Sequence, residues 1–247
     1  YLFVCWNTLI LFKTFGKEKI DLLHINSGGY PGAYSGMSAV FAARMRGIKR
    51  IVFVVNNIAL SYKTPRIWID YPLDRIVSKS VSVFVTGSAY AKQKLIEVLK
   101  LPSKYAVHIH NGIAPRKVTE SRAEVISRLG VEDNQLIFAV IAVLEERKGH
   151  FYLLKALELL KKQGKKIPIL LIEGTGSKLE SLQLTVRDFG LLENVKLIGT
   201  ETNVFNLLNA VDVLVLPSIS YEDFPNVTLE AMSLGKTVIA SSISGIP

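Results

Sequence analysis

The sequence predicts an α/β protein with two doubly wound, Rossmann-like domains, each built on a parallel sheet. Short apolar runs alternate with helical patterns along the whole chain, which is the pattern of repeated β–α units. A polar stretch at residues 110–135 divides this alternation into two arrays. With 247 residues, 49% of them hydrophobic, the chain can build two ordinary cores. We therefore expect domains at 1–115 and 116–247, with helices on both faces of each sheet.

The first array opens on an apolar segment, residues 1–12. This segment is too short to span a bilayer, which takes about 20 residues, and it lacks the basic region and the methionine that begin a signal peptide. Its apolar pattern predicts a buried helix. Apolar runs and helical spacing predict the other elements: strands at 20–25, 50–55, 81–86 and 105–110, and helices at 35–46 and 89–99.

The second array begins with a short helix. Ser121 and Glu124 have the spacing of a capping box, so this helix starts there and ends near Gly130. Parallel sheets of this kind bind ligands at the carboxyl ends of their strands, so the chemistry is expected at those ends. The same patterns predict the remaining elements: strands at 136–144, 167–172, 195–198, 211–216 and 237–240, and helices at 151–162, 178–189 and 226–233.

Composition narrows the classes of function. A single cysteine, Cys5, excludes an internal disulfide framework and fits a reducing compartment. The formal charge of +9 fits nucleic acid, an anionic membrane surface or phosphate-bearing ligands. The sequence has no RNA-binding aromatic signature and no zinc-ligand spacing, so nucleic acid is not expected as a partner. A generally basic, soluble surface remains an alternative explanation of the charge.

Two strand ends of the second array carry candidate phosphate-binding residues. Lys148 follows the strand at 136–144 and precedes a helix start, whose unpaired N–H groups favour an anion; a solvated charge cluster is the alternative. Gly174 and Gly176 follow the next strand, but Leu179 stands where a dinucleotide fingerprint needs a third small residue. NAD binding is therefore disfavoured, which leaves a tight strand-to-helix turn or a ligand-facing backbone.

Two glutamates flank the start of the helix at 226–233. Glu222 lies in the loop before it, Pro225 suits its first position, and Glu230 lies in its second turn. One acid in the first turn would serve as a cap, so Glu230 is too deep for that role. We expect both carboxylates to reach one ligand site at the helix N-terminus. A solvated charge on the helix face remains the alternative for Glu230.

These residues resemble the retaining glycosyltransferases of family 4, which have the two-domain GT-B fold. Glu222 and Glu230 form a Glu-x7-Glu motif, and "EAMSLGKTVIASSISGIP" continues from the second of them. Each matching segment is weak alone, and the set is specific together. The other segments follow the family order over nearly the whole chain: "DLLHINSG", "VTGSAYAKQKL", "IHNGI", "KGHFYLLKALELL", "LIEGTGSKLESL", "NVKLIGT" and "VDVLVLPS".

The resemblance implies a role for several of these residues. Glu230 would hold the ribose hydroxyls of a nucleotide sugar, since a carboxylate accepts two such bonds well. Glu222 and Lys148 would be catalytic: the glutamate beside the donor sugar, and the lysine neutralising the leaving diphosphate. The full donor-binding set that the resemblance implies is Arg147, Lys148, Gly174, Thr200, Ser218, Glu222, Phe224, Pro225, Asn226, Val227 and Glu230.

The resemblance also implies acceptor contacts on the first domain, at Asn26 and Asn56. The family commonly has a histidine after the strand at 50–55, where this chain has Asn56 and Asn57. Asparagine can bond a sugar hydroxyl but cannot exchange protons near neutral pH. The family also commonly has an arginine at a strand end where residues 141–144 are Ile-Ala-Val-Leu, and Arg147 is the candidate to compensate.

The implied activity is that of a hexosyltransferase. It would move a sugar from a nucleotide-diphosphate donor to an acceptor hydroxyl with retention of anomeric configuration, in cell-surface glycan or glycolipid synthesis. No cofactor and no metal are expected, because lysine and helix-end charge take the place of a metal. The acceptor would be a glycan, a lipid-linked sugar or a small molecule. The expected location is cytoplasmic, with the basic charge allowing a peripheral contact with the inner face of the membrane.

Two alternatives stay open. The missing arginine and histidine favour a catalytically impaired nucleotide-binding module on the same fold, and a sugar-nucleotide epimerase shares the two-domain plan. The chain starts at Tyr1, after the place of the family's glycine-rich first loop, and stops at Pro247, before the returning helix. We therefore expect an internal fragment of a longer protein, with the first domain incomplete at its start and the second incomplete at its end.

Overall fold

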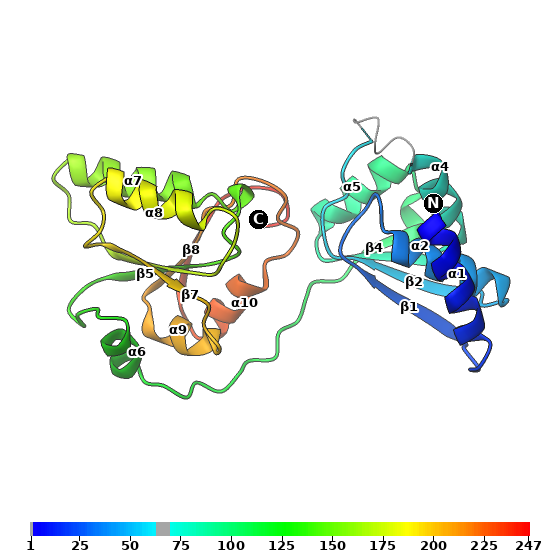
Figure 1. Ribbon diagram of the computed structural model, residues 1–247, viewed down its shortest axis with the longest axis horizontal. Coiled ribbons are helices and arrows are strands. Elements are labelled where there is room, and N and C mark those ends of the chain that lie inside the picture. The colour runs from blue at the N-terminus through cyan, green and yellow to red at the C-terminus, as the bar shows by residue number, and fades with distance from the viewer. Residues whose placement is uncertain (1, 63–69) are drawn as a thin grey trace. The chain divides into compact units, whose positions relative to one another are not determined.

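The structure is a computed structural model that describes residues 2–62 and 70–247 (Figure 1). The chain forms two compact units. The first consists of Tyr1–Asn111 with Glu222–Phe224, and the second of Gly112–Tyr221 with Pro225–Pro247. The division after Asn111 lies shortly before the predicted boundary.

The first unit is built on a parallel four-stranded sheet with the order β1-β2-β3-β4. Strand order equals chain order, so each crossover places the next strand beside the last. The carboxyl ends of all four strands therefore meet at one edge. In chain order the elements are α1 (Leu2–Phe15), β1 (Leu22–Ser27), α2 (Tyr34–Met45), β2 (Arg50–Val55), α4 (Tyr71–Ser80), β3 (Val83–Thr86), α5 (Ala89–Leu99), the 3-10 turn Ser103–Tyr105 and β4 (Ala106–His108).

One face of this sheet carries the core of the first unit. Phe53 and Phe84 are fully buried and pack with side chains from α2, α4 and α5. Gly36 lets α2 approach the sheet, because a Cβ there would lie 2.7 Å from the Phe53 ring. On the opposite face, Val52 and Val54 are half-buried. The prediction of full helical cover on both faces is therefore wrong for the first sheet within the described residues.

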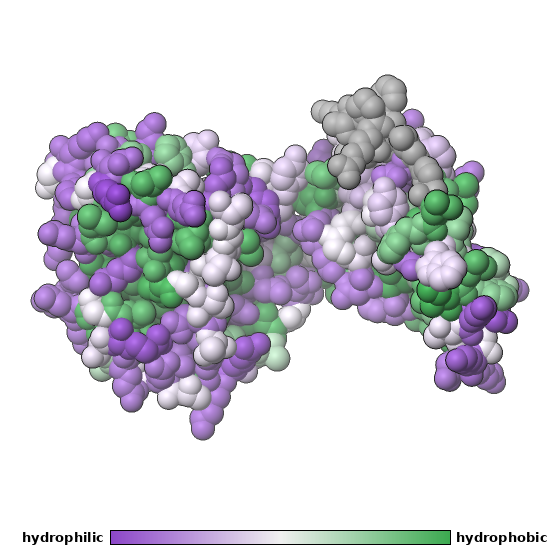
Figure 2. Space-filling view, viewed as in Figure 1, coloured by the Kyte–Doolittle hydropathy of each residue, from purple (hydrophilic) through white to green (hydrophobic). Residues whose placement is uncertain are grey.

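The first helix forms as predicted, but it is not buried. Val4 and Thr8 are its buried residues, and they lie toward α2, where the Ser38 hydroxyl donates to the Val4 carbonyl at 3.2 Å. Figure 2 shows hydrophobic residues gathered over α1 on the visible face. Only one narrow stripe of the helix meets the rest of the unit, so the prediction of a buried helix is wrong; Tyr1 lies outside the described residues. The exposed apolar side chains are Leu2, Phe3, Trp6, Leu9 and Ile10.

No helix in the described ranges has both the length and the apolar character needed to cross a membrane.

The second unit is built on a parallel five-stranded sheet with the order β7-β6-β5-β8-β9. The chain winds outward from β5 in one direction and then, from β8, in the other, which is the doubly wound arrangement. In chain order the elements are α6 (Arg122–Arg128), β5 (Ile137–Ile141), the 3-10 turn Glu146–Lys148, α7 (His150–Lys162), β6 (Ile169–Glu173), α8 (Leu179–Asp188), β7 (Val195–Gly199), α9 (Val204–Ala210), β8 (Val213–Leu216), α10 (Asn226–Ser233) and β9 (Thr237–Ala240).

The second unit has two cores, one on each face of its sheet, because successive side chains of β5 and β6 point to opposite faces. Val140, Leu170 and Ile172 pack with residues of α7 and α8. Ala139 and Leu171 point the other way and pack with residues of α6 and α9. Figure 1 shows these two helix pairs on opposite faces of the sheet. The central strands are therefore buried on both sides, which confirms the prediction from continuous apolar runs.

Most predicted elements are confirmed, and their ends differ by a few residues. The strands at 50–55 and 237–240 match in full, whereas the strand predicted at 105–110 shortens to β4. The capping box is present: the Glu124 backbone N–H donates to Ser121 Oγ, and the Ser121 N–H donates to the Glu124 carboxylate at 2.7 Å.

Two helices, α4 and α9, are not among the elements predicted from the sequence. Each connects two parallel strands, and parallel strands need a crossover connection, which is usually a helix. The predicted parallel topology therefore already called for a helix at both places. The start of α9 also carries a local signal, since Asn203 Oδ1 accepts the Phe205 N–H at 3.2 Å as an N-cap.

Candidate functional site

Backbone hydrogen bonds hold the loops at the carboxyl edge of the second sheet together. The Ile219 N–H donates to the Arg147 carbonyl at 2.8 Å, which joins the loop after β8 to the loop after β5. The Leu144 N–H donates to the Thr175 carbonyl at 2.9 Å, which joins the loop after β5 to the loop after β6. Three loops therefore form one continuous edge, where a parallel sheet binds ligands.

Lys148 stands at this edge, at the end of the 3-10 turn between β5 and α7. Its side chain is half-buried. Gly149 follows with φ 71°, in the left-handed region, and a Cβ there would lie 1.9 Å from the Pro217 carbonyl oxygen. Only glycine therefore lets the Lys148 loop lie directly against the end of β8.

Two ion pairs flank Lys148. Arg147 Nε lies 2.9 Å from Glu145 Oε2, and Lys178 Nζ lies 2.5 Å from Glu146 Oε2. Each pair is partly exposed, and pairs of this kind contribute at most about 1 kcal/mol. A bound anion can therefore compete with the carboxylates for these cations.

Gly174 lies against the backbone of the neighbouring loop. Its φ is 128°, and a Cβ would lie 2.1 Å from the Ala142 carbonyl oxygen. Its N–H donates to the Gly199 carbonyl at 2.7 Å. Gly176 also lies against backbone, since a Cβ there would lie 2.5 Å from the Leu144 carbonyl oxygen. The two glycines thus bring the strand ends together, and donor contact at Gly174 stays a prediction.

The loop after β7 is fixed by a buried carboxyl. Glu173, at the end of β6, is 6% exposed and accepts the Glu201 N–H at 3.0 Å. Burial raises the pKa of Glu173. Arg128 Nη1 binds the Glu201 carboxylate at 2.8 Å from the other side. Of the predicted residues on these loops, Thr200 is exposed and Ser218 is buried.

The helix α10 begins at Asn226, with Pro225 as its N-cap residue rather than its first helical residue. The backbone N–H groups of the first turn point out of this end of the helix and give it a positive potential, and the Thr228 N–H donates to the Pro225 carbonyl at 3.2 Å. Glu230 lies one turn further and is half-buried. Burial raises the pKa of Glu230, and the positive charge of Arg116 acts against that rise.

Glu222, Asp223 and Phe224 belong to the first unit. Glu222 is 5% exposed. Asp223 accepts the Ser88 hydroxyl at 2.6 Å and the Gly87 N–H at 3.2 Å, and burial raises its pKa while these bonds lower it. The two hydrogen bonds of Asp223 therefore fix the backbone directly after the buried Glu222.

Phe224 has a partner for its side chain as well as for its backbone. Its ring stacks on His110 with centroids 4.7 Å apart, and its carbonyl accepts the Asn111 amide at 3.4 Å. Because Glu222 and Glu230 fall in different units, their reach to one ligand site stays a prediction.

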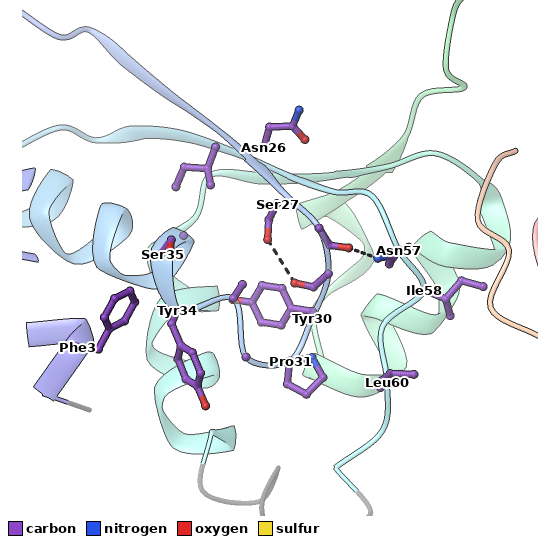
Figure 3. Close-up of a pocket in the computed structure, with 16 residues that line it drawn as sticks. Phe3, Asn26, Ser27, Tyr30, Pro31, Tyr34, Ser35, Asn57, Ile58 and Leu60 are labelled. Atoms are coloured by element: carbon purple, nitrogen blue, oxygen red, sulfur yellow. Dashed lines mark hydrogen bonds between the residues drawn. The ribbon is translucent and has the colours of Figure 1, made fainter. Parts of the chain in front are cut away.

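A pocket of about 610 Å³ opens at the carboxyl edge of the first sheet (Figure 3). It lies between the glycine-rich loop after β1, the start of α2 and the segment after β2. None of its described lining residues carries a formal charge, so it suits a neutral, hydroxyl-rich ligand better than a diphosphate. The lining side chains with polar groups are Asn26, Ser27, Tyr30, Tyr34, Ser35 and Asn57.

The two predicted acceptor-side asparagines occupy different positions. Asn26 lines the pocket, whereas Asn56 lies outside the lining and donates its amide to Asn26 Oδ1. The neighbouring Asn57 does line the pocket and donates to the Gly28 carbonyl. Asn56 thus orients a lining residue, and Asn57 is a lining residue that was not among the predicted site residues.

Among the residues that the structure describes, no cluster of three or more His, Cys, Asp or Glu side chains could hold a metal ion.

The predicted site residues fall in two groups, one in each unit. Asn26, Asn56, Glu222 and Phe224 belong to the first unit, and Arg147, Lys148, Gly174, Thr200, Ser218, Pro225, Asn226, Val227 and Glu230 belong to the second.

Residues 121–247 match the family described as glycosyl transferases group 1. The match covers half of the chain and includes the whole edge around Lys148 and Glu230. The chain belongs to the glycosyl transferases group 1 family. The resemblance to retaining glycosyltransferases is thereby confirmed at the level of the family.

Curated relatives of this group 1 chain carry transferase names. The UDP-Gal:alpha-D-GlcNAc-diphosphoundecaprenol alpha-1,3-galactosyltransferase of Escherichia coli is 28% identical over 244 residues, which are 95% of this chain and 61% of that protein. The amylovoran biosynthesis glycosyltransferase AmsK of Erwinia amylovora is 32% identical over 114 residues, 43% of this chain and 28% of that protein. The chain thus spans about three fifths of the Escherichia coli relative.

Solved structures share the fold of this group 1 chain. A glycosyltransferase from Rickettsia africae matches with a TM-score of 0.76 and 20% identity, over 98% of this chain and 63% of that one. Anabaena Alr3699/HepE in complex with UDP-glucose matches with a TM-score of 0.76 and 19% identity, over 96% of this chain and 64% of that one. These matches confirm the predicted fold class, two parallel α/β units of the GT-B type.

Proposed function

We propose that the protein is a retaining glycosyltransferase that transfers a hexose from a nucleotide-diphosphate sugar to an acceptor hydroxyl, in the synthesis of a cell-surface glycan or glycolipid. The observation that carries the proposal is the position of Lys148 at the carboxyl edge of the second sheet, between loops that backbone bonds lock together. Membership of the family supports it. UDP-hexose is the donor to test first, because the Escherichia coli relative is named for UDP-Gal and the HepE structure contains UDP-glucose.

On this proposal the second unit binds the donor without a metal. Lys148 and Arg147 supply positive charge to the diphosphate as its bond to the sugar breaks, and stabilising that charge is the main catalytic task. The N–H groups of Asn226 and Val227 add the positive potential of a helix start. Glu230 accepts the ribose hydroxyls, each through a bond to a charged group that is worth roughly 1.5–3 kcal/mol.

The pocket of the first unit would then hold the sugar of the acceptor. Its asparagine and serine side chains can pair with sugar hydroxyls, and its neutral lining disfavours a diphosphate. The name of the Escherichia coli relative gives a GlcNAc diphospholipid as acceptor, so a lipid-linked GlcNAc is the first acceptor to test. The formal charge of +9 supports a peripheral contact with an anionic inner membrane surface, where a lipid-linked acceptor would be reached.

The test is transfer of labelled sugar. The protein is incubated with radiolabelled UDP-galactose or UDP-glucose and a GlcNAc diphospholipid, and the product is analysed by chromatography and NMR. We expect a labelled disaccharide lipid with an α linkage. Lys148→Ala should abolish it, whereas Lys162→Ala, an exposed lysine on α7, should not.

Two other outcomes would overturn the proposal. Donor binding without transfer to any acceptor would indicate a nucleotide-binding module, which the apolar residues 141–144 favour because they replace an arginine. Release of an epimerised nucleotide sugar would indicate an epimerase.

A further inference from the structure

The pocket of the first unit is bordered by a buried set of tyrosines and carboxylates. Asp70 precedes α4 and Asp74 lies in its first turn, one helical turn apart. Asp70 is 7% exposed and Asp74 is 0% exposed. Carboxylates are rarely buried to this extent unless other groups bind them, so their partners decide what they do.

Asp70 ties one wall of the pocket to α4. The Tyr34 hydroxyl donates to Asp70 Oδ1 at 2.9 Å and lies 3.1 Å from Oδ2. Tyr34 begins α2 and lines the pocket. The glycine-rich loop passes close by, since a Cβ on Gly32 would lie 3.8 Å from Asp70 Oδ2.

Asp74 has one bonded oxygen and one without a partner. The Tyr62 hydroxyl donates to Asp74 Oδ2 at 2.5 Å. Asp74 Oδ1 has no hydrogen-bond partner among the described residues, and neither has the hydroxyl of Tyr30, which is 2% exposed. Burial and the nearby Asp74 charge raise the pKa of Tyr30, so its hydroxyl remains a donor near that carboxyl. A buried donor and a buried acceptor left apart are less stable than the same two groups paired.

Tyr62 is the residue through which Asp74 can reach the pocket, because it lies two residues after Leu60, which lines the pocket. Tyr30 also lines the pocket, and its ring lies edge-on to Phe53 and Phe84, with centroids 5.5 and 6.0 Å apart, so the ring is held in the core. The Tyr30 carbonyl accepts the Leu60 N–H at 3.0 Å, which joins the loop after β1 to the segment after β2. Figure 3 shows Tyr30 beside Pro31 and Asn57 in the lining. A shift of the segment that carries Leu60 and Tyr62 is therefore passed on to the loop after β1, the other border of the pocket.

We propose that Asp74 is a positioning residue for this pocket: its buried carboxyl binds the Tyr62 hydroxyl and so fixes the segment after β2 that lines the pocket and receives the acceptor. Asp74 is fully buried, so it acts through Tyr62 and does not touch the ligand. The identity of the ligand, an acceptor sugar, rests on the proposed function; the positioning itself does not.

The first readout is kinetic. Asp74→Asn, Tyr62→Phe and the double variant are compared with Glu97→Gln, which alters an exposed carboxylate on α5 of the same unit. With UDP-hexose and a GlcNAc diphospholipid, each single variant should raise the acceptor KM at least tenfold and leave the donor KM and kcat within twofold. The double variant should be no worse than the poorer single one, because both remove the same interaction. Glu97→Gln should match the wild type.

The second readout needs no activity. Amide hydrogen exchange of residues 28–33 should be at least tenfold faster in Asp74→Asn and Tyr62→Phe, with β6 of the second unit unchanged. If Asp74→Asn does not fold, Tyr62→Phe carries the same test.

The results distinguish the positioning role of Asp74 from the proposed transferase function. Unchanged exchange at 28–33, or equally faster exchange throughout the first unit, would overturn the positioning role. An equal rise in donor and acceptor KM would overturn it too. Faster exchange confined to 28–33 in a protein that transfers no sugar would support the positioning role and count against the proposed function.

Discussion

A single methyl group at Gly149 should test how the Lys148 loop is held. Gly149 has φ 71°, and an alanine there pays about 1–2 kcal/mol for the left-handed conformation. Its Cβ would also lie 1.9 Å from the Pro217 carbonyl oxygen, a backbone atom. Relieving such an overlap by shifting backbone typically costs a further 1–3 kcal/mol. We therefore expect Gly149→Ala to lower the free energy of unfolding by roughly 2–5 kcal/mol.

Gly164 provides the matched control. It has φ 70°, but nothing lies within 4 Å of the position of its Cβ, so Gly164→Ala loses only the conformational free energy of about 1–2 kcal/mol. Urea unfolding followed by circular dichroism measures both variants. Isothermal titration with UDP should show at least a tenfold loss of affinity for Gly149→Ala alone, because the shift moves Lys148. Equal destabilisation and equal UDP affinity in the two variants would refute the argument that the loop packs against the end of β8.

Three further predictions concern single ionisable groups. Glu230→Gln should raise the donor KM roughly ten- to a hundredfold, since a bond to a charged group is worth about 1.5–3 kcal/mol; unchanged steady-state kinetics would leave Glu230 as a solvated helix charge. Lys148→Ala should weaken UDP binding in calorimetry and barely change uridine binding, and equal losses for both ligands would indicate a structural role. Burial raises the pKa of Asp74 from 3.8 to about 7, so between these values the folded chain keeps a proton that the unfolded chain loses. Stability should therefore fall as pH rises from about 4 to 7, and thermal unfolding of Asp74→Asn should lose that slope; an unchanged slope would assign the proton to another group.

The fold could be predicted wherever burial is regular. The apolar runs of β5 and β6 are buried on both faces, so they leave a continuous signal in the sequence. The burial of α1 could not be predicted in the same way. The sequence shows that this helix is apolar, but only contacts with neighbouring elements decide how much of it is buried. In the structure, one stripe of α1 is buried, at Val4 and Thr8.

The candidate site could be predicted where a residue sits at a strand end, and not where it depends on tertiary contacts. Lys148 follows β5 at the ligand-binding edge, as its position in the chain suggested. The choice between Asn56 and Asn57 depended on side-chain direction, which alternates at each residue as the chain leaves β2. Asn56 turns to Asn26, and Asn57 turns to the pocket. Asp74 gave no signal at all, because its partners come from segments remote in sequence.

The strand end at residues 141–144 is apolar and lacks an arginine, so another cation would have to neutralise the charge of a diphosphate. Arg147 is paired with Glu145, and both side chains are about one-third to one-half exposed, 35% and 45%. An ion pair with that exposure is worth at most about 1 kcal/mol, so little free energy is lost when the carboxylate is replaced. A phosphate offers the same two-pronged geometry to a guanidinium and can take the place of the carboxylate. It follows that the missing arginine does not by itself argue against a diphosphate ligand, because Arg147 lies only a few residues further along the same loop.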